Sequence, residues 1–126
     1  MSATLTRNAK KKHLGKRGEQ LAARYFRSRG CDVIAHNVRY AVGEIDLIVR
    51  EPDGSIVIVE VKTRRGSGYG VAEAVTPRKL ARLRKAAAQW LNGKPLTTVR
   101  FDVVAITVAA DSWSVEHFRG VEDGAR

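Results

Sequence analysis

The sequence predicts a single α/β domain with a mixed central β-sheet and flanking helices. Two observations support this: hydrophobic residues alternate between helical and strand spacing in the order α-β-β-β-α-β-β, and 126 residues suffice for one core. With 44% hydrophobic and 29% charged residues, the composition is that of a globular domain. We expect a flexible basic arm at residues 1–12, the domain at 13–119 and a tail at 120–126.

The first predicted helix runs from Leu14 to Arg29, and Gly30 provides its stop signal. Its apolar residues fall on one arc at about 100° per residue. They are Leu14, Leu21, Ala22, Tyr25 and Phe26. The opposite side carries a cationic stripe that we expect to face solvent, made of Lys16, Arg17, Arg24 and Arg27.

Segments rich in β-branched residues predict five strands. They are residues 31–40, 43–51 and 55–63 before the second helix, and 100–109 and 112–118 after it. The glycine-rich segment 66–70 is a loop that either closes over a substrate or serves only as a linker.

The second predicted helix begins at Thr76-Pro77, where Thr is the N-cap and Pro takes the first helical position. Its core stripe consists of Leu80, Leu83, Ala87, Trp90 and Leu91. Asn92-Gly93 ends the helix, and Pro95 prevents it from resuming.

Charge is the most informative bulk property, since 23 Lys and Arg residues against 13 Asp and Glu give a formal net charge of +10. This excess predicts a polyanionic partner, and nucleic acid is favoured over a membrane because the apolar faces of both helices are needed for the core. No apolar run approaches the ~20 residues of a membrane span. A single cysteine and no secretory signal favour the cytoplasm.

The stretch GEIDLIVREPDGSIVIVEVK contains a Pro-Asp-Gly sequence that predicts a three-residue hairpin turn centred on Asp53. Residues whose numbers add up to 106 then face each other across the two strands. This register places Asp46 opposite Glu60 and Glu44 opposite Lys62. Four ionisable groups thereby meet in one patch.

The period of two along each strand assigns the remaining side chains to two faces. One face is wholly apolar and should pack on a helix: Ile45, Leu47, Val49, Val57, Val59 and Val61. The other face is apolar at Ile48, Ile56 and Ile58, and ionisable further from the turn. We expect a cleft at the ionisable end.

Two facing carboxylates repel each other, most strongly where they are partly desolvated. One of them can be protonated, Lys62 and arginines can neutralise the pair, or a divalent cation can lie between them. Carboxylate oxygens with waters and substrate phosphates are the usual Mg²⁺ ligands, so we favour Mg²⁺ or Mn²⁺. Such a metal would lower the pKa of a bound water that Lys62 positions or activates. The simpler alternative is a surface patch of ion pairs.

Asp46 followed by Glu60-Val61-Lys62 resembles the motif of the PD-(D/E)xK nuclease superfamily. The blocks GKRGEQLAARYF, NVRYAVGEIDLIV, IVIVEVKTR, AVTPRKLARLRKAA and RFDVVAI are similar to the YraN-like family of small bacterial proteins and cover residues 15–107. This resemblance implies a restriction-endonuclease-like fold, related to that of Holliday junction resolvases, and an endonuclease-like activity.

The resemblance also implies roles for individual residues. Asp46 and Glu60 would hold the metal, Lys62 would be the catalytic lysine, and Glu19 would match an acidic residue that related nucleases contribute from the first helix. Glu44 departs from the minimal motif and is either a third ligand or a partner that orients the lysine.

Basic residues beyond the third strand and on the second helix are candidates for contact with phosphates. They are Arg64, Arg65, Arg78, Lys79, Arg82 and Lys85. We place Arg78, Arg82 and Lys85 on the outer face of the second helix, where charge usually serves solvation only. Lys79 lies nearer the apolar arc, so we expect it in the cleft.

Three other residue types carry weaker signals. Asp102 lies in an apolar strand and, if buried, must find an arginine or a backbone amide. The three histidines have no ligand spacing, which argues against a zinc site. Cys31 is expected to be a small core residue.

We therefore expect a Mg²⁺-dependent endonuclease that hydrolyses nucleic acid, with DNA favoured. One rival is a nucleic-acid-binding module without catalysis, and another is a scaffold for partner proteins. An enzyme that cuts junctions would pair two sites by two-fold symmetry, which would make the protein a homodimer.

Overall fold

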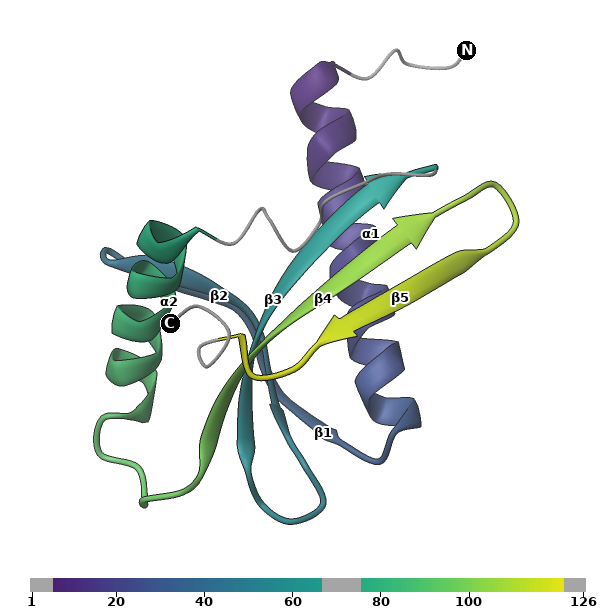
Figure 1. The fold of residues 1–126 in the computed structure, drawn as a ribbon. Helices are drawn as coiled ribbons and strands as arrows, with labels where there is room; N and C mark the ends of the chain where they lie inside the picture. The colour runs from purple at the N-terminus through teal and green to yellow at the C-terminus, as the bar shows by residue number, and fades with distance from the viewer. Residues whose placement is uncertain (1–5, 67–75, 122–126) are drawn as a thin grey trace.

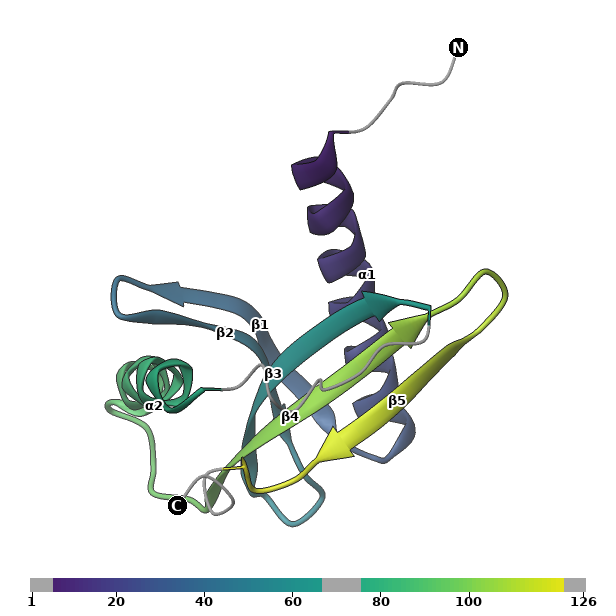
Figure 2. The same cartoon turned by 45° about the horizontal axis from the view of Figure 1, so that its top comes forward.

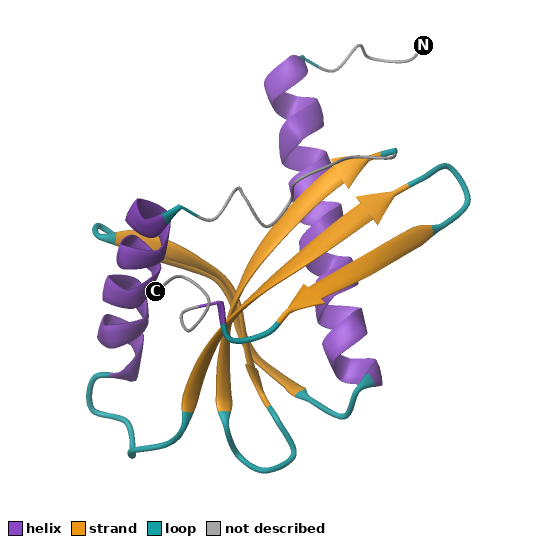
Figure 3. Cartoon of the chain, viewed as in Figure 1, coloured by secondary structure: helices purple, strands orange, loops and turns teal. Residues whose placement is uncertain are grey.

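The computed structural model describes residues 6–66 and 76–121, which form a five-stranded sheet between two helices (Figures 1 and 3). The elements are α1 (Arg7–Ser28), β1 (Asp32–Tyr40), β2 (Gly43–Arg50), β3 (Ile56–Arg65), α2 (Pro77–Leu91), β4 (Val99–Val108) and β5 (Trp113–Phe118). This confirms the α/β class and the predicted order of elements. Apart from Gly66, the predicted glycine-rich loop lies outside the described residues.

The sheet has the strand order β1-β2-β3-β4-β5, with β3 and β4 parallel and the other neighbours antiparallel. Parallel neighbours need a crossover connection, and α2 occupies it. α1 covers one face of the sheet and α2 packs on the other (Figure 2). Neither described helix is long and apolar enough to span a membrane.

α1 begins at Arg7, seven residues before the predicted start at Leu14, so residues 7–12 of the expected flexible arm are helical. The Thr6 side chain caps the helix by accepting a hydrogen bond from the Ala9 backbone N at 3.1 Å. Lys, Arg and Ala favour the helical state. Because no other described element packs on this part of the helix, its sequence lacks the apolar stripe by which a helix is usually predicted. Hydrophobic spacing therefore showed only the packed part of this helix.

The predicted hairpin turn is present between β2 and β3. Glu51 N donates to Ser55 O at 2.9 Å, and Gly54 adopts φ +92°, where glycine is favoured. The Asp53 side chain accepts from Ser55 N at 2.9 Å. The pairing of Ile48 with Ile58 confirms the predicted register next to the turn.

The register does not extend to the acidic patch, because the ladder between β2 and β3 ends at the Leu47–Val59 pair. The expected pairings of Asp46 with Glu60 and of Glu44 with Lys62 are therefore wrong as backbone pairs. β2 continues on β1 instead, and the two strands curve away from β3, so the sheet opens like a V (Figures 1 and 2).

The bend changes which face each side chain occupies. Ile45 packs in the core under α2 together with Ile48, and not with Leu47 on the α1 side as predicted. Residues three apart share a face only where a strand departs from the regular period of two. On the neighbouring strand β1, Asn37 has φ +51°, which marks the same bend.

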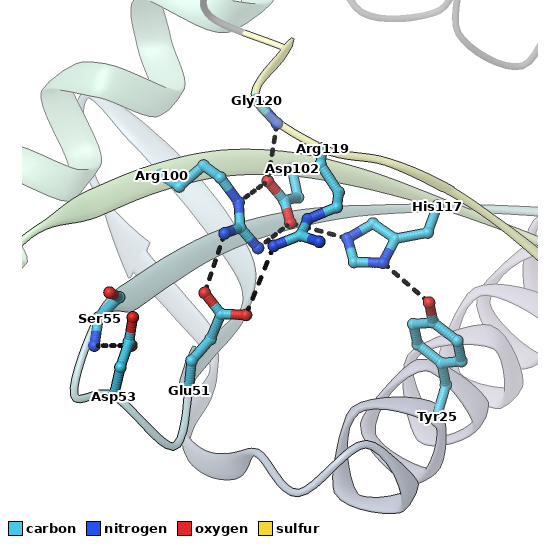
Figure 4. A network of polar contacts seen from close by, with 9 residues as sticks. All are labelled: Tyr25, Glu51, Asp53, Ser55, Arg100, Asp102, His117, Arg119 and Gly120. Atoms are coloured by element: carbon cyan, nitrogen blue, oxygen red, sulfur yellow. Dashed lines mark hydrogen bonds and ion pairs between the residues drawn. The ribbon is translucent and has the colours of Figure 1, made fainter.

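Asp102 lies at the centre of a buried polar network on the other side of the V (Figure 4). Arg100 donates to its two carboxylate oxygens at 2.8 and 2.9 Å, and Gly120 N donates at 3.0 Å. His117 Nε2 lies 2.7 Å from Oδ2. Both partners expected from the sequence, an arginine and a backbone amide, are present. Burial raises the Asp102 pKa, but these hydrogen bonds outweigh it and lower the pKa to about 2.

The network joins four elements of the fold. Tyr25 on α1 hydrogen-bonds His117 Nδ1 on β5 at 2.8 Å, and Arg100 on β4 donates to Glu51, just after β2, at 2.9 Å. The network thereby holds together the part of the sheet in which β3, β4 and β5 stay paired (Figure 4).

We predict that Asp102→Asn lowers the free energy of unfolding at pH 7 by about 3 kcal/mol, because it removes one partner from a buried charged network. A depressed pKa stabilises the fold above the ordinary value of 3.8 and loses that effect toward pH 2. The difference between variant and wild type in urea unfolding should therefore shrink as the pH falls. Asp111→Asn, at an exposed turn, is the control. Equal effects of the two substitutions would contradict this role.

Candidate active site

The divergence of β2 from β3 opens a cleft of about 660 Å³, bounded by the tip of the β1–β2 hairpin, by β3 and by α2. Predicted site residues line it: Glu44, Asp46, Glu60, Lys62, Lys79 and Arg82. The cleft thus exists because the strands separate where the carboxylates begin.

Asp46 and Glu60 meet although their backbones are not paired. Both residues are only 8% exposed, and their side chains hydrogen-bond each other. Asp46 Oδ2 also accepts a hydrogen bond from Val61 N at 2.8 Å. The Asp46 side chain therefore fastens β2 to β3 just beyond the end of the ladder.

This burial has an electrostatic consequence. Desolvation, followed by the charge and the hydrogen bond of Glu60, raises the Asp46 pKa from 3.8 to about 8, against the opposing effect of Val61 N. Without a cation, the pair therefore holds a proton at neutral pH. Protonation is thus one of the two ways in which the metal-free protein offsets the repulsion, and the ion pair of Glu60 with Lys79 is the other.

Two lysines stand beside the carboxylates. Lys79 Nζ lies 3.4 Å from Glu60 Oε2, which places Lys79 in the cleft as its position near the apolar arc predicted. Burial, with the hydrogen bond and charge of Lys79, lowers the Lys62 pKa. Burial also lowers the Lys79 pKa, but the contacts with Lys62 and Glu60 outweigh it and raise the value. Lys62 is thus the lysine that loses its proton more readily.

Glu19 and Glu44 lie further out. The Glu44 side chain is 50% exposed and forms an ion pair with Arg39 at 3.8 Å. Glu19 is half-buried on α1 and hydrogen-bonded to Asn37, and burial raises its pKa. Its charge reaches Asp46, yet it lines a neighbouring groove and not the cleft. Across residues 6–66 and 76–121, no three acidic, histidine or cysteine side chains form a metal-binding cluster.

The other predicted basic residues differ in their distance from the cleft. Arg82 is exposed, as its assignment to the outer face predicted, but it also lines the cleft, which helical spacing did not indicate. Arg78 and Lys85 are exposed elsewhere on α2, while Arg64 and Arg65 lie at the end of β3.

Gly43 is a residue whose importance the sequence analysis missed. A Cβ atom at this position would lie 2.8 Å from the Arg82 carbonyl oxygen, so the glycine lets the hairpin tip approach α2 closely. Its place directly before Glu44-Ile45-Asp46 was a possible signal, but only the tertiary contact explains it.

We predict that Asp46→Asn stabilises the metal-free protein at alkaline pH. A raised pKa favours the folded state at low pH, and that contribution is lost as the pH rises through about 8. Each pKa unit corresponds to about 1.4 kcal/mol, so the variant should gain at least that much over wild type between pH 5 and pH 9. Urea unfolding in EDTA measures this gain.

The matched control is Glu44→Gln, an exposed carboxylate of the same strand. It should follow wild type at both pH values. A stability difference for Asp46→Asn that stays constant between pH 5 and pH 9 would show that the Asp46 carboxyl is not perturbed.

Comparison with known proteins yields bacterial relatives across most of the chain. A UPF0102 protein from Corynebacterium efficiens is 50% identical over 118 residues, which cover 92% of this chain and 97% of the relative. One from Rhodococcus jostii is 49% identical over 110 residues, 84% and 92% of the two chains. One from Nocardia farcinica is 44% identical over 125 residues, 95% and 98% of the two. Residues 18–106 match the family described as uncharacterised protein family UPF0102, and the chain belongs to this YraN-like family.

Proposed function

We propose that the protein is a metal-dependent nuclease that hydrolyses phosphodiester bonds in nucleic acid, with DNA as the favoured substrate. The observation that carries the proposal is the buried pair of Asp46 and Glu60, joined by a hydrogen bond at the floor of an open cleft beside Lys62 and Lys79.

The residues of the cleft fit a hard divalent cation. Mg²⁺ takes oxygen ligands and commonly binds one or two carboxylates, with waters and substrate phosphates completing the octahedron. Asp46 and Glu60 supply such oxygens, and a cation would remove the repulsion that raises the Asp46 pKa. Bound there, Mg²⁺ or Mn²⁺ would act as a Lewis acid and lower the pKa of a coordinated water. Glu19 and Glu44 would add negative potential from a greater distance.

The chain's own cations have distinct roles in this proposal. Lys62, with its lowered pKa, orients the attacking water and accepts its proton. Lys79 and Arg82 line the same cleft and stabilise negative charge as it develops on the phosphate oxygens. The net charge of +10 draws the polyanionic substrate toward the site.

The carboxylates also separate this proposal from a binding module without catalysis. A surface that only holds phosphates gains nothing from two acidic groups in its cleft, since they repel the ligand and are costly to bury. In a metal-dependent reaction the two acidic groups would serve as metal ligands.

We predict that Mg²⁺ and Mn²⁺ bind to the wild-type protein with a calorimetric heat that Asp46→Asn abolishes. With a fluorescent panel of duplex, single-stranded, flap and four-way DNA and RNA, Asp46→Asn and Lys62→Ala should each lower the metal-dependent cleavage rate by at least about 100-fold. Affinity for nucleic acid should remain within about three-fold, because phosphate contacts elsewhere are retained.

Lys94→Ala is the matched control for Lys62→Ala, because it removes one exposed lysine that follows α2 and does not line the cleft. It should bind and release metal and cut substrate like the wild type. Tight binding of nucleic acid without metal heat and without cleavage of any substrate would refute the nuclease and favour a binding module.

A further inference from the structure

We infer that the N-terminal half of α1 is a docking surface for the phosphate backbone of duplex nucleic acid, with Lys12 and Lys16 making the contacts. The inference rests on the proposed function of the cleft, and it names the form of the substrate and its path toward the site.

The first three turns of α1 stand apart from the core. No side chain in residues 9–17 is fully buried, and burial begins at Gly18. At 1.5 Å per residue, the stretch from Arg7 to Gly18 is roughly 16 Å long. Figures 1 and 2 show this end of α1 projecting beyond the sheet, on the side toward which β2 and β3 separate. This helical stretch, residues 7–18, is called the α1 arm. It extends next to the open end of the V formed by β2 and β3 (Figures 1 and 2).

The charged side chains of the α1 arm are all positive. The stretch RNAKKKHLGKRG has no acidic residue, and its exposed cations include Lys10, Lys11, Lys12, Lys16 and Arg17. The first turn holds no Asp or Glu, although the helix dipole favours them there. Like charges three or four residues apart destabilise a helix that nothing else supports. A bound polyanion would remove this repulsion.

A groove of about 430 Å³ leads from the arm to the cleft. It is lined by Lys12 and Lys16 on α1, by Arg39 on β1, and by Glu19 and Glu44. Glu44 also lines the cleft, so the two hollows share a wall. Since Glu44 already pairs with Arg39, the two lysines are the cations of the groove that remain available for phosphates among the described residues.

Gly15 on the same side of the helix supports a close approach. A Cβ atom at this position would meet nothing within 4 Å, so packing within the described residues does not require glycine there. Gly18 differs, because its Cβ would collide with Thr63 of β3. Glycine inside a helix is unfavourable, but it lets a ligand backbone come close to the helix.

The chemistry of the arm favours a duplex over other polyanions. Residues 7–18 contain no Phe, Tyr or Trp, and a single His13 does not provide the series of aromatic side chains on which successive unpaired bases stack. Leu14 is their only large apolar residue, which leaves no apolar face to enter a membrane. A straight helix of this length spans about five base pairs of rise along a duplex axis.

The test compares two double variants with the same change in charge on the same helix. Lys12→Gln/Lys16→Gln removes the cations of the groove, whereas Lys10→Gln/Arg17→Gln removes two exposed cations that do not line it. Binding of a fluorescent duplex of about 20 base pairs is measured in EDTA as a function of salt. The slope of log K against log salt should fall in magnitude by about 1.8 for the first variant, 0.9 per lost phosphate contact, and by less than about 0.5 for the second.

A third variant tests the geometry without changing charge. Gly15→Leu fills the groove with a good helix former and should weaken duplex binding by about ten-fold while circular dichroism shows an intact helix. Equal slopes for the two double variants, unchanged affinity of Gly15→Leu, or tighter binding of the single strand than of the duplex would each overturn the inference.

These outcomes are independent of catalysis. Duplex binding that depends on Lys12 and Lys16, without cleavage by the wild type, would leave the docking surface in place and refute the nuclease. Cleavage that Asp46→Asn abolishes, together with duplex binding that the groove variants do not change, would support the nuclease and refute the docking surface.

Discussion

The contact on which the rest of the site depends is the hydrogen bond from Val61 N to the Asp46 carboxylate. Backbone pairing of β2 with β3 stops at Leu47, and at the preceding residue, Asp46, a side chain bridges the two strands instead. A side chain holds the strands together without keeping their backbones parallel, so β2 can turn away with β1 and leave a cleft. The group that allows the opening is therefore also one of the two acids that the cleft presents. The Asp46 side chain therefore determines both the shape of the cleft and part of its chemistry.

Such an opening removes strand pairing from part of the sheet, and contacts in two other regions compensate for the pairing that is lost. Near the turn, Ile48, Ile56 and Ile58 pack under α2, while Leu47, Val57 and Val59 pack under α1. On the far side, the network around Asp102 connects α1, β4, β5 and the end of β2. The two buried aspartates are thus opposites: cationic and amide donors surround Asp102 and keep it ionised, whereas Asp46 faces another acid and takes up a proton. The half of the domain around Asp102 thus holds an aspartate paired with donors, and the half around the cleft holds two neighbouring acids.

Much of this architecture could be predicted from local sequence signals. The Pro-Asp-Gly turn determined the register from Arg50 to Leu47, and Thr76-Pro77 marked the start of α2. What could not be predicted depends on long-range contacts. The bend at Asp46 placed Ile45 on the other face, since the period of two assumes a regular strand. The helical state of residues 7–12 escaped detection because it involves no packing. The position of Arg82 at the cleft follows from how closely the hairpin tip approaches α2 at Gly43, and helical spacing alone does not contain that information.

The distribution of charge gives the cleft its polarity. In a protein with a net charge of +10, positive potential is the general background, and the buried acids are the exception. A phosphate chain approaching along α1 would meet lysines first, then Arg39 with Glu44, and only at the end the pair of Asp46 and Glu60. For the proposed substrate, the long-range field would attract the polyanion, while the short-range field of the two acids would repel it. The proposed divalent cation would resolve this conflict, because it is attracted to the acids that repel phosphate and itself attracts phosphate. The proposed metal would therefore bind to the two acids and take a phosphate oxygen of the substrate as a further ligand.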